Sequence, residues 1–230
     1  MAASRRLPSP LGVLRRARLA SNIVRSMSGS VANNPTNAAS VSLRRLLADR
    51  AAAGDITRYL DELPGSVRSK EVLGVTGNGL KHLYDTMEGA PPASLEELVP
   101  PDEEGTITYE GRNSLPVFSR FQKRFARIGD VVVGYNHQIL SFVTGPGYFV
   151  ALRRNGEGQH GDEVIFDYTV EPPRGPDDWP PYKPNDAGLA RQVFGNLNDY
   201  VRRVGRGVVV GKAYKQGVDQ DTYFSLSRAI

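Results

Sequence analysis

The spacing of apolar residues changes at Pro100 and Pro101, and this change constrains the fold more than any other feature of the sequence. Before the two prolines, apolar side chains recur at helical spacing in short segments that end near glycine or proline. After them, β-branched and aromatic residues gather in runs separated by glycine-containing turns, which is typical of strands joined by hairpins. The chain is therefore predicted to be an α+β protein, with short helices first and an antiparallel sheet second.

Residues 41–99 are predicted to form a helical subdomain. Ser94 and Glu97 form a capping box, in which each side chain bonds the backbone near the other, so one helical turn is expected to begin there. Four earlier helices are expected from the spacing of apolar residues: 42–53, 56–63, 66–73 and 80–87. Helices this short are not stable alone in water, so their apolar stripes are expected to pack against the rest of the chain.

Residues 100–230 are predicted to form a second unit, a curved antiparallel sheet of about five to seven strands with one long C-terminal helix packed on it. Strands are expected in seven segments: 106–110, 117–128, 131–144, 148–153, 164–170, 208–215 and 222–227. The long helix is predicted over 186–204, where apolar residues from Leu189 to Val204 recur along one stripe. The proline-rich segment 171–184 lacks backbone donors and is expected to be an extended connection.

Residues 1–40 contain six arginines and no acidic residue, which separates them from the rest of the chain. Leu19, Ile23 and Met27 recur at four-residue spacing, so the segment resembles a mitochondrial transit peptide. The alternatives are a disordered basic leader without a targeting role and an upstream start codon wrongly included in the gene. The protein is expected to be mitochondrial if the leader is a transit peptide and cytoplasmic otherwise.

The charge of the remaining chain argues against two kinds of partner. Without the leader, the chain has 23 basic and 25 acidic side chains, so the folded part is close to neutral. It therefore lacks the basic surface that sequence-independent phosphate binding requires. No apolar run is long enough for a transmembrane helix. We expect neither nucleic-acid binding nor a membrane-spanning segment.

The supply of metal-binding and nucleophilic side chains is small. The chain has no cysteine and only three histidines, which removes disulfides, thiolate zinc sites and cysteine nucleophiles. We expect no metal site, and the sequence names no cofactor.

His137 and Asp167 are the two residues considered for catalysis. His137 lies in a run of four hydrogen-bonding side chains, 135–138, inside a predicted strand, and Asp167 lies in a strand expected to be half buried. If the fold brought them together, they would suit general acid–base chemistry in a hydrolase- or isomerase-type enzyme. The favoured interpretation is structural, with His137 on a surface strand face and Asp167 ion-paired or turned outward.

Basic and aromatic residues alternate from Phe118 to Arg127. Such a pattern can stack and clamp nucleic-acid bases. The favoured interpretation is one aromatic face in the core and one basic face in solvent.

The aromatic residues on the predicted strands lead to the main functional hypothesis. The sheet and its covering helix would enclose an apolar pocket for a small hydrophobic ligand, with a few polar groups on its wall. Five residues are the candidates for contacting that ligand: Tyr135, His137, Tyr148, Phe149 and Tyr168. The chain would then be a non-catalytic binding protein. The enzyme described above and a protein-interaction or assembly module remain open as alternatives, as does the oligomeric state.

Several short motifs carry a resemblance. They are residues 134–136, 144–149, 199–204 and 210–213, together with Tyr223 and Phe224. In these motifs the C-terminal half resembles uncharacterised bacterial proteins of no assigned activity. The resemblance implies no catalytic residue and no ligand.

Overall fold

A computed structural model describes residues 41–137, 144–153 and 161–230. These residues belong to one compact unit, Val41–Ile230. Residues 1–40 lie outside the described part of the chain, and so do residues 138–143 of the strand predicted over 131–144.

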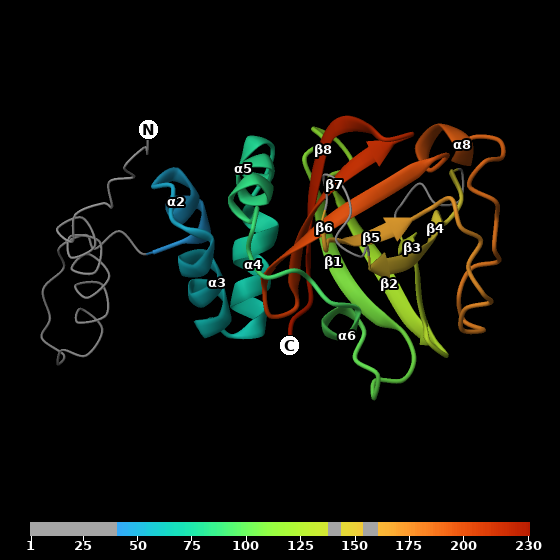
Figure 1. Ribbon diagram of the computed structural model, residues 1–230, viewed down its shortest axis with the longest axis horizontal. Coiled ribbons are helices and arrows are strands. Elements are labelled where there is room, and N and C mark those ends of the chain that lie inside the picture. The colour runs from blue at the N-terminus through green and yellow to red at the C-terminus, as the bar shows by residue number, and fades with distance from the viewer. Residues whose placement is uncertain (1–40, 138–143, 154–160) are drawn as a thin grey trace, which may run out of the picture. The chain divides into compact units, whose positions relative to one another are not determined.

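Eight antiparallel strands close into a barrel, in which each strand pairs with its neighbours in sequence and β8 pairs with β1 (Figure 1). The strands are β1 Ile107–Asn113, β2 Arg120–Ile128, β3 Val131–His137, β4 Tyr148–Arg153, β5 Val164–Asp167, β6 Leu197–Gly205, β7 Val208–Lys215 and β8 Val218–Ser227. Seven of these strands overlap the predicted segments. The predicted curved sheet of about five to seven strands is wrong, because eight strands pair and the first pairs with the last to close a barrel.

The long helix predicted over 186–204 is also wrong, because the second part of the segment is a strand. Only Ala190–Val193 is helical (α8), and β6 follows four residues later, beginning at Leu197. Asn196 lies between them with a φ of 55°, a left-handed value at which a helix ends. The apolar stripe is ambiguous, since residues four apart share a face in a strand as well as in a helix. Leu197 and Val201 accordingly both pack inside the barrel.

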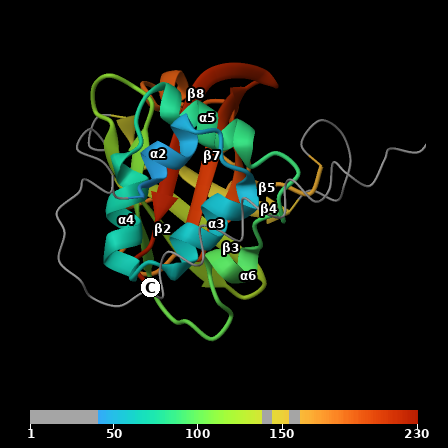
Figure 2. The same cartoon turned by 90° about the vertical axis from the view of Figure 1, so that its left-hand side faces the viewer.

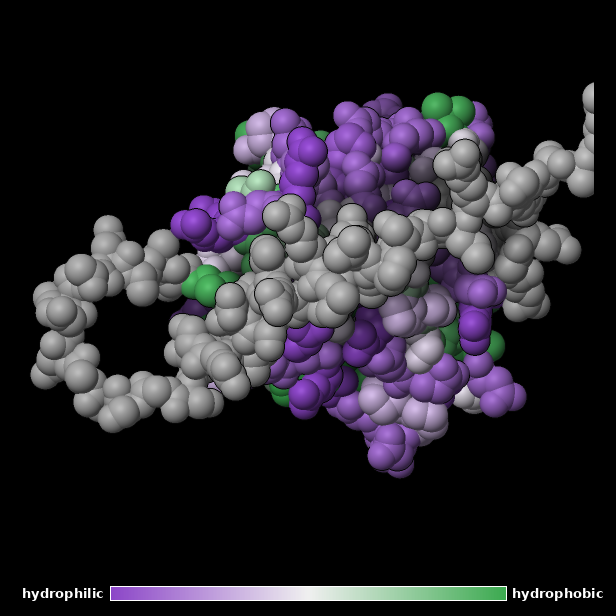
Figure 3. All heavy atoms as spheres, turned by 60° about the vertical axis from the view of Figure 1, so that its left-hand side comes forward, coloured by the Kyte–Doolittle hydropathy of each residue, from purple (hydrophilic) through white to green (hydrophobic). Residues whose placement is uncertain are grey.

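Four helices lie as a layer over the outer face of β6, β7 and β8, where three of them contact the strands and the first packs on the other three (Figures 1 and 2). They are α2 Leu43–Ala48, α3 Ala53–Glu62, α4 Gly65–Gly74 and α5 Asn78–Thr86. Leu60, Leu80 and Leu83 pack with Val204 and Val208 of the barrel, so these short helices bury their apolar stripes as expected. The part of the layer's surface that grey atoms do not cover in Figure 3 is mostly hydrophilic. None of the described helices has the length and apolar content of a membrane span.

Inward-facing glycines make room for aromatic rings in the barrel. Gly134 on β3 pairs with Phe149 on β4, and a Cβ on the glycine would lie 2.4 Å from the phenylalanine ring. Gly211 on β7 and Phe224 on β8 repeat this arrangement, and a Cβ on Gly211 would lie 2.2 Å from the Phe224 ring. Each ring therefore lies over the backbone of the neighbouring strand, which only glycine permits.

One end of the barrel is closed by α6 Leu95–Leu98 and the residues next to it. Leu98 and Val99 are buried in the same cluster as the barrel interior. The Tyr109 hydroxyl donates a hydrogen bond to the Leu98 carbonyl at 3.1 Å, and the Arg127 guanidinium donates to the Val99 carbonyl at 2.5 Å. These bonds hold the short helix in place, and a pocket of about 10 Å³ lies beside it.

Candidate functional site

The opposite end of the barrel contains a cavity of about 300 Å³. The ends of β1 and β7, the start of β8 and the helix α8 line it. Its apolar lining residues are Leu115, Phe121, Val193, Phe194, Leu197, Ala213 and Phe224. Polar side chains of Asn113, Gln192, Lys215, Gln220 and Thr222 also line it. The volume is at the lower end of the range for ligand sites, so the cavity suits one small molecule.

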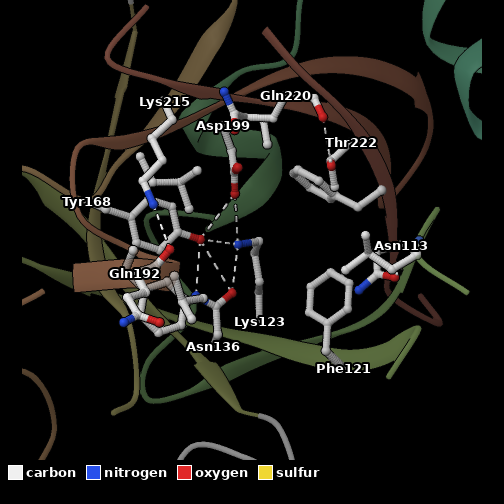
Figure 4. Close-up of a pocket in the computed structure, with 16 residues that line it drawn as sticks. Asn113, Phe121, Lys123, Asn136, Tyr168, Gln192, Asp199, Lys215, Gln220 and Thr222 are labelled. Carbon is white, nitrogen blue, oxygen red and sulfur yellow. Dashed lines mark hydrogen bonds and ion pairs between the residues drawn. The ribbon is translucent and has the colours of Figure 1, made fainter. Parts of the chain in front are cut away.

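Lys123 lies at the floor of this cavity (Figure 4). Its residue surface is only 2% exposed. The Nζ donates hydrogen bonds to Asn136 Oδ1 at 2.8 Å, to Asp199 Oδ2 at 3.1 Å and to the Tyr168 hydroxyl. An ammonium group has three N–H donors, so each of them has an acceptor.

Asn136, Tyr168 and Asp199 complete a set of four buried polar residues, named here the Lys123 cluster. The Tyr168 hydroxyl donates to Asp199 Oδ2 and accepts from Asn136 Nδ2, each at 3.1 Å. The same amide nitrogen donates to the Gly147 carbonyl at 3.1 Å. The four residues come from β2, β3, β6 and the residue after β5, so the closure of the barrel is what assembles them.

Aromatic rings surround the charged nitrogen of Lys123. Five ring centroids lie 4.9 to 5.8 Å from Nζ: those of Phe121, Phe149, Phe166, Tyr168 and Phe224. Ring faces attract a cation, and they also keep water away from it. Phe149 and Phe166 stack on each other with centroids 5.0 Å apart and separate the cluster from the filled part of the lumen.

Burial changes the ionisation of two members of the cluster. Removal from water lowers the pKa of Lys123, while the Asp199 carboxylate opposes this change by favouring the ammonium form. Removal from water and the same negative charge raise the pKa of Tyr168 well above its ordinary value. The phenol therefore keeps its proton, and Asp199 is the group that holds the charge on Lys123.

α8 forms one wall of the cavity. The Phe194 ring, next to α8, stacks on the Tyr168 ring with centroids 5.7 Å apart and planes 6° from parallel. Gly147 lies under Phe194, and a Cβ there would be 2.5 Å from the ring. Lys215 Nζ donates to the Gln192 carbonyl at 2.6 Å, which ties the end of β7 to α8.

The structure separates the predicted ligand contacts into two groups. Tyr168 lines the cavity, and Phe149 lies in the lumen against Lys123. Tyr135 and Tyr148 lie on the outer face, where their rings are 4.8 and 6.0 Å from that of Trp179. The cavity is therefore inside the barrel, and not between a sheet and a covering helix.

His137 and Asp167 both lie away from the cavity lining. They belong to β3 and β5, with β4 between these strands. His137 is exposed. Partial removal of its ring from water and the nearby charge of Arg124 lower its pKa. Asp167 Oδ1 accepts hydrogen bonds from the Thr169 backbone at 2.8 Å and hydroxyl at 2.6 Å. No hydrogen bond or ion pair joins His137 to Asp167 in the described part of the chain, so the structure does not bring the pair together.

Sequence reasoning missed three members of the Lys123 cluster: Lys123, Asn136 and Asp199. The interpretation of 118–127 as an aromatic core face and a basic solvent face places Lys123 in water, yet strand alternation puts it on the same face as Phe121 and Phe125. That alternation is the signal that locates Lys123. Asp199 falls in the segment predicted as a helix, and no local pattern links it to a lysine 76 residues earlier.

Comparisons of this chain with protein-family models, curated proteins and solved structures give no match. The resemblance of the C-terminal half to bacterial proteins of no assigned activity thus stays a prediction. Within the described ranges, no group of three or more His, Asp or Glu side chains could hold a metal ion.

Proposed function

We propose that this protein binds one small, largely apolar molecule in the cavity at the open end of the barrel, with the polar end of that molecule at the Lys123 cluster. The observation that carries the proposal is the buried Lys123 cluster at the floor of a cavity whose lining includes seven apolar side chains. Ligand sites are commonly built in this way, with apolar surface for affinity and a few placed polar groups for orientation. Eight-stranded barrels are also wide enough to hold one small ligand.

The energetics of the Lys123 cluster support the same proposal. A buried ion pair loses the hydration of both charges, and well-packed apolar residues in its place are often as stable or more stable. Lys123 and Asp199 are 2% and 4% exposed, so this cost applies to both. The pair is therefore a poor choice for stability alone, and orientation of a ligand gives it a use.

The size of the cavity can be tested by filling it. Ala213 faces Asp199 across the β6–β7 pair and lines the cavity, so Ala213→Phe places a ring in the space proposed for the ligand. Leu152→Phe is the matched control, because Leu152 is exposed and lies outside the cavity lining. Binding of hexan-1-ol, octan-1-ol and decan-1-ol to the full chain is measured by displacement of a fluorescent apolar probe.

We expect the wild-type chain and Leu152→Phe to bind octan-1-ol equally. Ala213→Phe is expected to bind it at least about tenfold more weakly, since each methylene excluded from the cavity loses about 0.8 kcal/mol. Absence of binding by every alcohol, or equal binding by the two phenylalanine variants, would contradict the proposal.

A further inference from the structure

The amine of a lysine such as Lys123 can act as a nucleophile as well as a hydrogen-bond donor. A lysine becomes reactive when its amine is removed from water beside apolar surface, and such lysines form imines with carbonyl compounds. Lys123 Nζ lies among five aromatic rings at the floor of a cavity that admits a small molecule. We propose that Lys123 binds an apolar aldehyde or ketone covalently, as an iminium, in this cavity.

The inference rests on the proposed function, because the same cavity has to admit the apolar part of the carbonyl compound. It adds to the proposed function a class of ligand, apolar aldehydes and ketones, and a covalent bond to Lys123. Lys215 also lines the cavity, but its Nζ donates to the Gln192 carbonyl near the rim and is half-buried. The reactivity of Lys123, which lies among the rings, can therefore be compared with that of Lys215 in the same protein.

The neighbours of Lys123 supply the proton transfers that the reaction requires. The ammonium gives one proton to Asp199, and the neutral amine attacks the carbonyl carbon, so that a C–N bond forms and the C=O π electrons move to oxygen. A proton moves from nitrogen to that oxygen. Asp199 then returns its proton to the hydroxyl, which leaves as water while the nitrogen lone pair forms the C=N bond. The net change is ammonium plus carbonyl to iminium plus water.

Two contacts of the Lys123 cluster suit these reaction steps. The Tyr168 hydroxyl donates to Asp199 Oδ2 at 3.1 Å and contacts Lys123 Nζ, so it can pass a proton between the carboxylate and the reacting oxygen. Asp199 Oδ2 lies 3.1 Å from Nζ and keeps a positively charged partner when the iminium replaces the ammonium. The ion pair thus survives the reaction. Burial also lowers the pKa of Lys123, which increases the share of neutral amine.

Reductive trapping tests the proposal. The full chain is incubated with octanal and sodium cyanoborohydride, which reduces an iminium to a stable secondary amine, and the modified lysine is located by peptide mass mapping. We expect the octyl group on Lys123 to form at least about tenfold faster than on Lys215 or any other lysine. Lys70→Arg, at an exposed lysine outside the cavity lining, is expected to leave the adduct on Lys123 unchanged, and Lys123→Met to abolish it.

Tyr168→Phe separates a chemical role from a structural one. It keeps the ring that stacks on Phe194 and removes the hydroxyl. We expect trapping on Lys123 to slow about a hundredfold, as for the loss of a general acid–base group. Binding of octan-1-ol should weaken by about tenfold at most, which is the loss of one hydrogen bond.

The outcomes distinguish the two proposals. Binding of octan-1-ol and octanal without selective modification of Lys123 overturns the covalent inference and leaves the proposed function intact. Equal modification of all lysines has the same meaning. Failure of both compounds to bind overturns the proposed function itself.

Discussion

The two halves of the barrel interior differ in what fills them. Next to α6, the lumen is packed with buried apolar side chains. At the other end, four polar side chains are buried and a cavity of about 300 Å³ opens above them. Phe149 and Phe166 lie between the two halves. The same eight strands therefore provide a solid half that carries stability and a hollow half in which charged groups are placed.

This difference shows where the chain departs from the most stable packing. A closed barrel of this size can be filled by side chains throughout, as the half next to α6 is. The half with the cavity instead keeps an ion pair in a low-dielectric site, where each charge depends on its partner. Mutations in the two halves should thus differ in the kind of loss that they cause.

Asp199→Ala is expected to have the largest effect, because it leaves the Lys123 ammonium buried without its counter-charge. Removing one partner of a buried pair costs about 3 to 5 kcal/mol in the free energy of unfolding. The loss should shrink at high pH, where an unpaired lysine releases its proton. Denaturant unfolding at neutral and alkaline pH measures both effects.

The double variant Lys123→Met/Asp199→Leu is the control for Asp199→Ala. It removes both charges and fills their volume with apolar atoms, so we expect it to be within about 1 kcal/mol of the wild type or more stable. A double variant as unstable as Asp199→Ala would show that the half with the cavity needs the ion pair to fold.

Tyr109 and the closed half should control part of the stability at alkaline pH. Burial raises the pKa of Tyr109 from 10.0 to about 12. Because the folded-state pKa is the higher one, the stabilisation is fully present below pH 10 and is lost as the pH rises from about 10 to about 12. The wild type should lose about 2 to 3 kcal/mol in this window through Tyr109 alone.

Tyr109→Phe is expected to flatten this part of the pH profile. It also loses the hydrogen bond to the Leu98 carbonyl, which costs about 1 kcal/mol at neutral pH. Tyr182→Phe is the control, since Tyr182 is 42% exposed and its phenol ionises at a smaller cost. Unfolding free energies measured from pH 8 to pH 12 test the prediction, and equal slopes for wild type and Tyr109→Phe would contradict it.

Local patterns in the sequence predict most of the elements but not their closure. Ser94 caps α6 as predicted, with its hydroxyl oxygen accepting from the Glu97 backbone at 3.0 Å. Tyr148–Arg153 and Val208–Lys215 are strands with the predicted bounds. These elements are set by neighbours in sequence, through caps, turns and alternation.

The site depends on pairings that no local pattern specifies. Closure joins β1 to β8, whose paired residues Glu110 and Ser227 are far apart in the sequence. The Lys123 cluster needs that closure, because its members come from separate strands. The sequence of β6 predicts a helix, because residues four apart share a face in a helix and in a strand. A helix there does not place Asp199 beside Lys123.

Gly134→Ala is expected to have the smallest effect, and it tests the boundary between the two halves. A Cβ at residue 134 would lie 2.4 Å from the Phe149 ring and 2.7 Å from the Arg124 carbonyl oxygen. The Phe149 ring and the backbone at Arg124 both have to shift, and overpacking of this kind costs about 1 to 3 kcal/mol. Gly54→Ala in α3 is the matched control, because no atom lies within 4 Å of its Cβ. There alanine should stabilise the helix by about 0.5 to 1 kcal/mol. Both changes are measured by thermal and denaturant unfolding, and destabilisation of equal size at the two positions would show that Phe149 is not held by its contact with Gly134.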